Sequence, residues 1–514
     1  MSQTLSTINI SHIDEISSSK NEPDWLKEHR KISLSVYQNL PIETSPLYNK
    51  YTDAKKMDPT QVSISVSTAD KIPSFLEKRL TELENETCIV QIGTHIHKIN
   101  ISDELKSKGL VISSIEDAIK NNSELVKKSL ESSNSKNDKF TALNNAAFNS
   151  GVFIHIPKNL ILDKPIHVVT SLSDDGISTI SRNIIFADES SKATIVQELY
   201  SPKSEKQQAY LELFNTNVAP NAHLDVTTLQ MMDQNTVNFS TRRTDLGKDA
   251  KVNWYSGLFG AILSRYKIEY NLNGSGASSS DSEVIFGNKE QSFDIQTDVN
   301  HEAPATEGRV VEKSILRNKS KSLFKGMIRI KKNATKSNSF LSGRSILLDK
   351  DAKSDSIPGL EIFTNDVKAT HSASVAQIDE EQIFYLQTRC LSIQEAERTI
   401  IEGFLEPLSR KMSFQVRAWI AHLIESKWDD KELTINTDEE LAKFVEVEET
   451  RYNEDAEIEP TTDQEQQEQE EQNENSNSEG DSGEGSSSDN GNSDENSSGS
   501  DDNGGSDDNG GSEN

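Results

Sequence analysis

Cysteine is nearly absent from this chain of 514 residues, which contains only Cys88 and Cys390. Two thiols so far apart do not make a disulfide framework, and the N-terminal residues lack the basic start and apolar run of a secretory signal. No apolar run approaches the roughly 18 residues that a membrane-spanning helix requires. We therefore expect a cytoplasmic protein rather than a disulfide-rich secreted protein or a helical membrane protein.

Lysine and arginine are absent after Arg451, whereas about 21 acidic residues lie between Glu454 and the C-terminus. Most of the formal net charge of −30 therefore belongs to the tail 451–514. This tail cannot bury enough apolar surface to offset its chain entropy, so we expect it to be disordered. A solubilising role is favoured, and a contact to a basic partner or to metal ions is the alternative. Nucleic acid is not an expected partner, because the rest of the chain has no basic stripe.

Several catalytic signatures are also missing. The chain has no GxxxxGK[ST], GxSxG, HExxH or CxxC motif, which excludes a P-loop ATPase and gives no sign of a hydrolase or zinc site. His95 and His97 share one strand face, but no cysteine or third histidine lies nearby, so ordinary strand residues are favoured over metal ligands. A sugar-cleaving enzyme would need a carboxylate pair at a defined separation, and no spacing singles one out. The chain is not expected to be an enzyme.

The first part of the chain has a mixed pattern. Residues 1–20 are expected to be disordered and 21–145 to be mostly helical, because EPDWLKEHRKISLSVYQNLP and SSIEDAIKNNSELVKKSLESS space their apolar residues at the helical period. Ser113 or Ser114 is a candidate helix cap. Between these segments, CIVQIGTHIHKINI predicts a short pair of strands.

From 146 to 378 the hydrophobic period becomes two. Short alternating runs such as ATIVQEL, LDVTTLQ, VNWYSGLF and SEVIFG follow one another with almost no helical pattern. Four alanines recur ahead of such runs roughly 28 residues apart, a period typical of stacked repeats: Ala193, Ala222, Ala250 and Ala277. Each repeat would bury its apolar face only against its neighbours. The pattern therefore predicts a mainly β fold, with a β-helix favoured over a barrel.

The region 379–450 returns to helical spacing and is expected to cap the last β coil, as the end of a solenoid requires. A further amphipathic helix is predicted in SRKMSFQVRAWIAHLIESKW. Two capping boxes and two helix breakers organise the preceding segments: Asp379 with Gln382, Ser392 with Glu395, and Gly403 and Pro407.

One histidine stands out in DVKATHSASVAQI. On a strand, His371 would share a face with Val367, Ala369, Ala373 and Val375, in the middle of an apolar row. A lone histidine in such a row is ordinarily a core residue with satisfied hydrogen bonds. The row alone therefore gives no reason to assign it a function.

A long segment carries a resemblance to a known family. The run from QSFDIQTDVNH through SLFKGMIRIKKNATKSNSFLSGRSILLDKDAKSDSIPGLEIFTNDVKATHSASVAQIDEE to LSIQEAERTIIEGFLEPL resembles the SufB/SufD family of iron–sulfur cluster assembly proteins. EPDWLKEHR and FTALNNAAFNSGVFIHIPK are similar to the same family, so the likeness covers roughly residues 20–430. It implies a right-handed parallel β-helix flanked by helical regions.

Within the family, the chain is most similar to SufD. SufB has a cysteine where Arg344 or Ser345 stands here, and a His–Glu pair where His371 and Ser372 stand. ATHSASVAQIDEE is similar to the SufD pattern, which implies that His371 lies near a dimer interface and takes part in cluster assembly as a transient iron ligand. Three glycines of that pattern are replaced, by Ser372, Ala376 and Cys390, so the local backbone path is in doubt.

The resemblance also implies partners. A SufD-like subunit pairs with a SufB-like subunit through the β-helix and binds a SufC-like ABC ATPase through C-terminal helices, here 392–425. The candidate docking residues are Ser392, Glu395, Phe404 and Leu405. Clusters normally need four ligands, mostly thiolates, so two cysteines imply a transient iron–sulfur cluster shared with the partner. Whether a reduced flavin binds, as in some complexes of this family, stays open. The alternatives are a SufB-like homodimeric scaffold and a β-helix interaction protein without a cluster role.

Overall fold

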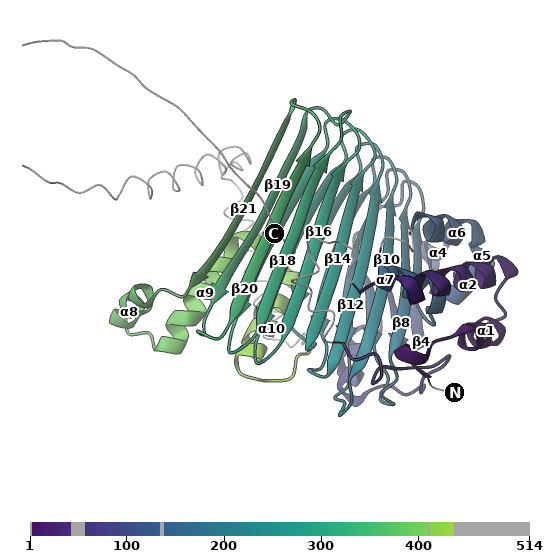
Figure 1. Cartoon of the computed structure of the whole chain (residues 1–514), viewed down its shortest axis with the longest axis horizontal. Coiled ribbons are helices and arrows are strands. Elements are labelled where there is room, and N and C mark those ends of the chain that lie inside the picture. The colour runs from purple at the N-terminus through teal and green to yellow at the C-terminus, as the bar shows by residue number, and fades with distance from the viewer. Residues whose placement is uncertain (1–2, 43–56, 134–137, 410–411, 436–514) are drawn as a thin grey trace, which may run out of the picture. The chain divides into compact units, whose positions relative to one another are not determined.

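The core is a β-solenoid in which successive strands from β6 to β21 alternate between two sheets (Figure 1). Within β6–β21, the even-numbered strands form a nine-stranded sheet together with β5. The odd-numbered strands form a ten-stranded sheet together with β3 and β4. The computed structural model describes residues 3–42, 57–133, 138–409 and 412–435. The predicted β-helix core is confirmed, whereas the predicted acidic tail lies outside the described residues.

The solenoid begins with two short strands, and from β8 onward its strands are 8 to 11 residues long. They are β6 (Val152–Ile156), β7 (Ile166–Ser171), β8 (Thr179–Ala187), β9 (Lys192–Tyr200), β10 (Gln208–Val218), β11 (His223–Met231), β12 (Thr236–Leu246), β13 (Lys251–Leu258), β14 (Leu263–Leu272), β15 (Ser278–Gly287), β16 (Ser292–His301), β17 (Glu307–Leu316), β18 (Lys321–Ile330), β19 (Ser337–Leu347), β20 (Lys353–Ile362) and β21 (Val367–Gln377). Each strand pairs in parallel with the strand two positions along the chain. Inward side chains therefore stack on the equivalent side chains of neighbouring coils, and the core is continuous along the solenoid.

The alanine repeat marks the start of the odd-numbered strands. Ala222, Ala250 and Ala277 each lie directly before a strand and are buried. Ala193 differs, because it is the second residue of β9 and stacks on Leu224 rather than on Ala222. The predicted repeat is therefore correct for Ala222, Ala250 and Ala277. Ala193 lies two residues after the position that is equivalent to Ala222.

The corners before the odd-numbered strands share a left-handed backbone. Seven successive corner residues have φ between 53° and 72°: Asn159, Ser190, Asn221, Asp249, Gly276, Ala305 and Lys336. Glycine and asparagine adopt this conformation readily, whereas a residue with a Cβ and no local hydrogen-bonding side chain is strained there. Ala305 has a Cβ but no side-chain group that could form a local hydrogen bond, so we expect its strain to be the least compensated of the seven.

The N-terminal region supplies helices and short strands. They are β1 (Gln3–Thr4), the 3₁₀ turn η1 (Leu5–Thr7), α1 (Ile10–Ser19), α2 (Asp24–Asn39), β2 (Ser63–Ile64), the 3₁₀ turn η3 (Ser74–Leu76), α3 (Glu77–Glu82), β3 (Cys88–Ile92), β4 (His95–Asn100), α4 (Asp103–Ser107), β5 (Val111–Ser114), α5 (Ile115–Asn121), α6 (Ser123–Ser132) and α7 (Lys139–Ala147). The predicted strand pair is β3 and β4, which are antiparallel. Ser114 caps α5 by accepting a hydrogen bond from the Asp117 backbone.

The prediction of disorder for residues 1–20 is wrong over the part that the structure describes. Asn9 caps α1 by accepting from the His12 backbone N–H, and Ile13 and Ile16 of that helix are fully buried. Two isoleucines three residues apart place one apolar stripe against the helical layer. The serine-rich composition of the segment concealed that stripe.

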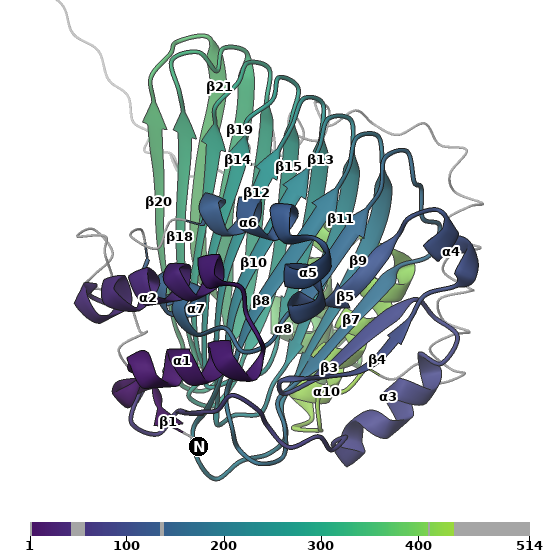
Figure 2. The same ribbon diagram turned by 90° about the vertical axis from the view of Figure 1, so that its right-hand side faces the viewer.

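Buried polar contacts hold the helices to one another and to the nine-stranded sheet, which α2 and α7 overlie in Figure 2. The Arg30 guanidinium binds the Glu22 carboxylate through two hydrogen bonds of 2.6 and 2.8 Å. Asp138, the cap of α7, accepts from Arg265 of β14 at 2.9 Å. This arginine lowers the pKa of Asp138 to about 2 against the opposing effect of its burial. Because both members of each pair are buried, loss of one member would leave an unpaired charge.

In the part of the chain described up to residue 435, three helices follow the solenoid: α8 (Glu380–Thr388), α9 (Ile393–Ser409) and α10 (Phe414–Trp428). The predicted capping box at Ser392 is confirmed, since its N–H donates to Glu395 and the Glu395 N–H donates back to Ser392. The predicted breaks at Gly403 and Pro407 are wrong. Proline lacks an N–H and crowds the carbonyl four residues earlier, which belongs here to the exposed Gly403. Burial of nearby apolar side chains of α9 against the solenoid lets the helix continue.

The prediction that the C-terminal helices cap the last coil is wrong. Apolar residues of α9 and α10 pack against the outer face of the ten-stranded sheet, together with side chains from β7, β9, β11 and β15. An amphipathic pattern shows that a helix buries one face and does not show which surface receives it. None of the described helices is long and apolar enough to cross a membrane.

Replacing Ala305 by glycine is expected to stabilise the protein by up to about 1 kcal/mol, because it relieves left-handed strain at a corner. Ala303 lies in the same corner and does not have a positive φ. The control Ala303→Gly should instead lower the stability by about 0.5–1 kcal/mol through added chain entropy. Urea denaturation midpoints measure both, and a midpoint for Ala305→Gly at or below that of the control would contradict this account of the corners.

Candidate functional site

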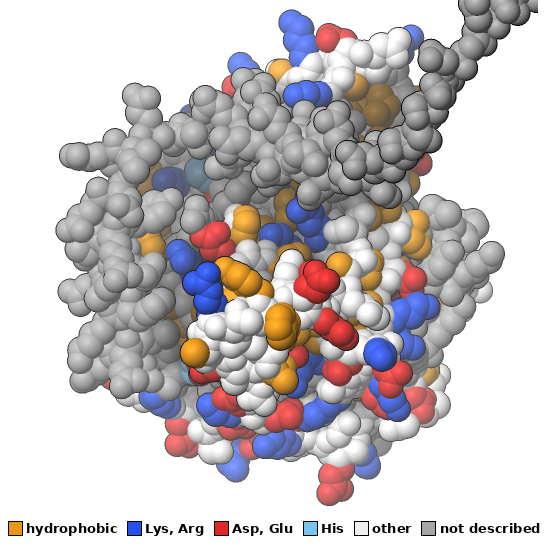
Figure 3. Space-filling model, turned by 90° about the vertical axis from the view of Figure 1, so that its left-hand side faces the viewer, with side chains coloured by type: hydrophobic (Ala, Val, Ile, Leu, Met, Phe, Trp, Pro, Cys, Tyr) orange, Lys and Arg blue, Asp and Glu red, His pale blue; other side chains and the backbone are white. Residues whose placement is uncertain are grey.

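The two strands of the last coil end the two sheets. β20 pairs only with β18, and β21 only with β19, so neither outer edge has a strand partner in the part of the chain that the structure describes. Large apolar side chains at this end are exposed: Leu360, Ile362, Phe363 and Val375. Figure 3 shows this side of the molecule, where hydrophobic side chains lie among charged ones. An unpaired strand edge beside exposed apolar side chains is a surface suited to pairing with another chain.

His371 lies in the middle of β21. Its Cα pairs with Leu341 of β19, whose side chain is fully buried in the core. Val367 and Ala369, in the same row, pack partly against that core, so the predicted inward face of the row is confirmed. His371 itself is nevertheless exposed. The reason is that no further coil covers β21 among the described residues.

A column of buried acids runs inside the solenoid behind this strand. Asp281 and Glu283 lie on β15, and Glu312 of β17 pairs directly with Glu283. The same row continues through Gly343 to Ala373 of β21. All three carboxyl groups are buried, and each has at least one oxygen without a hydrogen-bond partner among the described residues.

Burial dominates the ionisation of these acids. It raises the pKa of Asp281 to about 7 and that of Glu312 to about 8. Burial, with the charges of Asp281 and Glu312, also raises the pKa of Glu283 well above its usual value. Glu283 retains one acceptor contact, from the Thr297 hydroxyl at 3.3 Å. At neutral pH the solenoid interior at β15 and β17 therefore favours the protonated forms of Glu283 and Glu312. The sequence analysis singled out no carboxylate pair. Acids at inward positions of two neighbouring strands of one sheet, here Glu283 and Glu312, would have indicated one.

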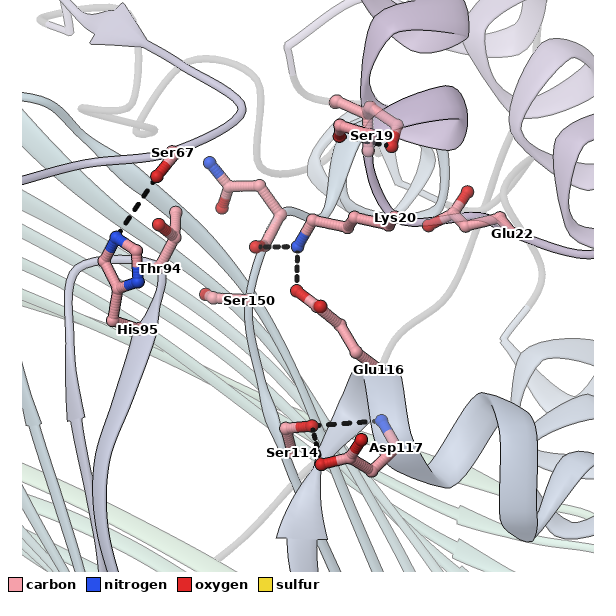
Figure 4. A network of polar contacts seen from close by, with 12 residues as sticks. Ser19, Lys20, Glu22, Ser67, Thr94, His95, Ser114, Glu116, Asp117 and Ser150 are labelled. Atoms are coloured by element: carbon pink, nitrogen blue, oxygen red, sulfur yellow. Dashed lines mark hydrogen bonds and ion pairs between the residues drawn. The ribbon is translucent and has the colours of Figure 1, made fainter.

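A second polar site lies at the opposite end of the solenoid (Figure 4). A cavity of about 650 Å³ is lined by β4, by the start of α5 and by the end of α1. Lys20 forms a short ion pair with Glu116 and donates to the Asn149 carbonyl at 2.5 Å. Burial lowers the pKa of Lys20 although Glu116 opposes that shift. These contacts fasten α1 to the first coil.

His95 at this site is held by two hydrogen-bond partners of one ring nitrogen. Its Nε2 lies 2.9 Å from the Thr68 carbonyl and 3.1 Å from the Ser67 hydroxyl. Because a carbonyl can only accept, Nε2 carries the proton and cannot take one from Ser67. No group of three or more histidine, cysteine or acidic side chains is placed to hold a metal ion within the described ranges.

The two cysteines lie in different surroundings. Cys88 is buried in β3, where burial raises the pKa of its thiol. Cys390 is exposed after α8 with φ of 68°. It thus occupies a left-handed position that glycine favours. The two residues are not paired in a disulfide.

The proposed docking residues of α9 do not share one surface. Ser392 and Glu395 are exposed at the start of the helix. Phe404 is half-buried, with the Lys313 ammonium 4.9 Å from its ring centre, and Leu405 is buried against the solenoid. The adjoining α8 has no buried residue, and three exposed apolar side chains that the sequence analysis did not single out lie on it or just beyond it: Phe384, Tyr385 and Ile393.

Comparisons with known proteins cover most of the chain. Residues 19–168 match the model of the SufBD protein N-terminal region, and residues 169–404 match the SufBD core domain of SUF system FeS cluster assembly. An iron-sulfur cluster assembly SufBD family protein of Staphylococcus aureus (strain USA300) is 29% identical over 429 residues, which is 80% of this chain and 91% of the relative. A protein of the same description from Staphylococcus epidermidis is 27% identical over the same length.

Replacing Glu312 by glutamine should reduce the loss of stability at alkaline pH. The pKa of Glu312 rises from 4.5 to about 8 on folding, so its contribution is full below pH 4.5 and is lost as pH rises through 8. The wild-type melting temperature should therefore fall between pH 5 and pH 9, and that of Glu312→Gln should fall less. The control Glu307→Gln changes an exposed acid of the same strand and should behave as wild type. Equal slopes for both variants would contradict the assignment.

Proposed function

Because this chain belongs to the SufBD family of iron–sulfur cluster assembly proteins, we propose that it is a SufD-like scaffold subunit of a SUF assembly complex. In this proposal it pairs with a SufB-like subunit and is driven by a SufC-like ATPase, and it catalyses no reaction itself. The supporting observation is the exposed His371 on a coil whose outer strand edges are unpaired among the described residues. The iron–sulfur cluster is the cargo of the complex.

The pairing surface in this proposal is the terminal coil. Strand edges offer backbone donors and acceptors in a row, and a second solenoid can satisfy them by continuing the two sheets. The exposed Phe363 and Val375 would then be buried in the seam. Arg344 and Ser372, where a SufB-like chain has a cysteine and a glutamate, favour the SufD-like role of this chain within the pair.

His371 would supply one ligand at that seam. A neutral imidazole nitrogen is a good ligand for iron. Its neighbours in the row, Ala369 and Ala373, have short side chains and leave space beside the ring for groups of the partner. Cys88 is buried, so the thiolates that a cluster requires would come mainly from the SufB-like chain.

The ATPase contact is placed on α8 and the start of α9. The exposed Phe384, Tyr385 and Ile393 form the apolar part of this proposed surface, with Ser392 and Glu395 beside them. Leu405 would not contribute, since it packs inward. A cytoplasmic location belongs to the same proposal, and the two unpaired cysteines are in keeping with it. Binding of a reduced flavin by the complex stays a prediction.

Two other functions have specific support. A SufB-like homodimer would use the same free edges, and purification from the native cytoplasm without any SufB-like chain would favour it. A plain β-helix interaction protein would use the exposed apolar side chains without the histidine. The first of the two variants below separates the plain interaction protein from the proposal, and the second tests the ATPase contact.

Replacing His371 by alanine should leave the complex assembled and lower its iron and sulfide content at least about tenfold, because even the loss of a group that orients a metal ligand typically weakens metal binding about 10–100-fold. Co-expressed subunits are purified together, and iron and sulfide are measured per complex. The control Thr370→Ala changes a neighbouring exposed residue of β21 and should keep the wild-type content. Normal cluster content in His371→Ala would instead support the plain interaction protein.

Replacing Phe384 by aspartate should weaken binding of the ATPase subunit at least about tenfold, because it places a charge in an apolar contact. Ile161 of the N-terminal half has a similar exposed fraction, 62% against 68%, so Ile161→Asp is the matched control. Isothermal titration of the purified ATPase subunit into each variant measures both. An unchanged affinity for Phe384→Asp would remove α8 from the docking surface.

A further inference from the structure

A pocket of about 330 Å³ lies where α10 meets the corners of the solenoid. Its apolar floor comes from successive corners of three coils, with one wall from η3: Phe75, Tyr200, Met231, Met232 and Phe259. The next corner adds polar residues, Asn288 among them. The end of α10 and the segment to Leu433 close its other side. The pocket is separate from the terminal coil that carries His371, so nothing in the proposed function uses it.

Lys427 is the unusual residue of this pocket. It lies in the last turn of α10, and only 4% of it is exposed. Its ammonium group donates to the Phe259 carbonyl through a short contact and to Gln291 Oε1 at 2.5 Å. No acidic side chain forms an ion pair with it among the described residues. A lysine is almost never buried to this degree without a counter-ion.

A second buried polar group in the pocket lacks a partner. Asn288 is 6% exposed, and its side-chain carbonyl accepts no hydrogen bond from the described residues. Its amide nitrogen is 3.4 Å from Asp430, which also pairs with Lys289 at 3.2 Å. The pocket therefore contains one buried cationic donor and one buried free acceptor beside an apolar floor. Such buried groups are costly unless something satisfies them.

The buried charge of the pocket favours an anion over a cation. Its lining includes the lysines 203, 289, 427 and 431, against the acids Asp233, Asp430 and Glu432. Lys289 is paired with Asp430, and Lys431 with Asp429. The lining charges that remain are equal in number, Lys203 and Lys427 against Asp233 and Glu432. Lys427 is the buried one among them, so the charge on the inside of the pocket is positive.

We propose that this pocket binds a small amphipathic carboxylate, with the carboxylate on Lys427, a hydrogen-bond donor of the ligand on Asn288 and the apolar part on the Met231–Phe259 floor. The ligand would rest against α10 and four solenoid corners at once. Its binding would therefore strengthen the attachment of the C-terminal helices to the solenoid. This role is independent of the cluster site and would persist if the proposed function were wrong.

Ionisation of Lys427 gives the proposal a specific signature. Burial, and then the charge of Lys289, lowers the pKa of Lys427 well below its usual value, while Asp430 opposes the shift. An anion held beside the amine would raise that pKa again, since it stabilises the charged form. Binding at a pH above the pKa of the free protein therefore takes up a proton, at most one per ligand. Affinity for a carboxylate should accordingly fall as pH rises.

The experiment titrates three probes of one shape, each with a hydroxyl donor, into the full chain: 3-phenyllactate, the neutral alcohol 3-phenyl-1,2-propanediol and the cationic 1-amino-3-phenyl-2-propanol. Isothermal titration in two buffers of different ionisation enthalpy, repeated from pH 7 to pH 10, gives affinity and proton uptake together. We expect the carboxylate to bind at least about tenfold more tightly than the alcohol, as a charge-assisted hydrogen bond implies, with uptake of a proton. Equal affinity for acid and alcohol, absence of proton uptake or no binding at 10 mM would each overturn the proposal.

Two variants assign the effect to Lys427. Lys427→Met keeps the length of the side chain without its charge and should weaken the carboxylate at least about tenfold and abolish the proton uptake. The control Lys431→Met removes an exposed lysine of the rim and should change affinity less than about threefold. If Lys427→Met does not fold by circular dichroism, Lys427→Gln keeps a donor without a titratable charge and must also show no proton uptake. Proton uptake equal to that of the wild type in Lys427→Met or in Lys427→Gln would contradict the proposed site.

Discussion

The structure depends on one constraint. The backbone donors and acceptors of a strand in a stack of coils all find partners only when another strand lies on each side of it. Parallel pairing in register from β6 to β21 aligns the inward rows and gives a single apolar core along the solenoid. The same pairing leaves two exposed backbone edges wherever the stack ends. Another chain can therefore bind at an end of the stack, unless other parts of the protein cover the edges there.

The two ends are treated differently. At the N-terminal end, the sheets finish in the antiparallel strands β4 and β5, and helices fastened by buried pairs such as Arg30–Glu22 and Arg265–Asp138 cover the adjoining sheet. At the C-terminal end, β20 and β21 are followed by helices that pack against the side of the solenoid rather than over its last coil. The described chain thus closes one end and leaves the other available, and His371 lies on the available end. This asymmetry connects the fold to the proposed pairing.

The sequence predicted what repetition and alternation encode. Period-two runs and the spacing of Ala222, Ala250 and Ala277 indicated a stacked β fold, and the parity of the strand placed His371 on the inward face. Parity cannot show whether another coil follows, so the exposure of that histidine needed the structure. The burial of Ile13 and Ile16, the continuation of α9 through Pro407 and the inward position of Leu405 all depend on packing partners distant in sequence. Lys427 and Asn288 are brought together by a helix and a corner more than a hundred residues apart, which no local pattern reports.

Amide hydrogen exchange of β20 and β21 tests the central claim most directly, in the isolated chain and in a complex purified with its SufB-like and ATPase partners. If the terminal coil is the pairing surface, amides on its free edges exchange rapidly in the isolated chain and on the order of a hundredfold more slowly in the complex. Amides of central strands such as β12 should be protected equally in both samples. Edges of β20 and β21 that exchange equally fast with the partner bound, or that are already fully protected in the isolated chain, would contradict the account.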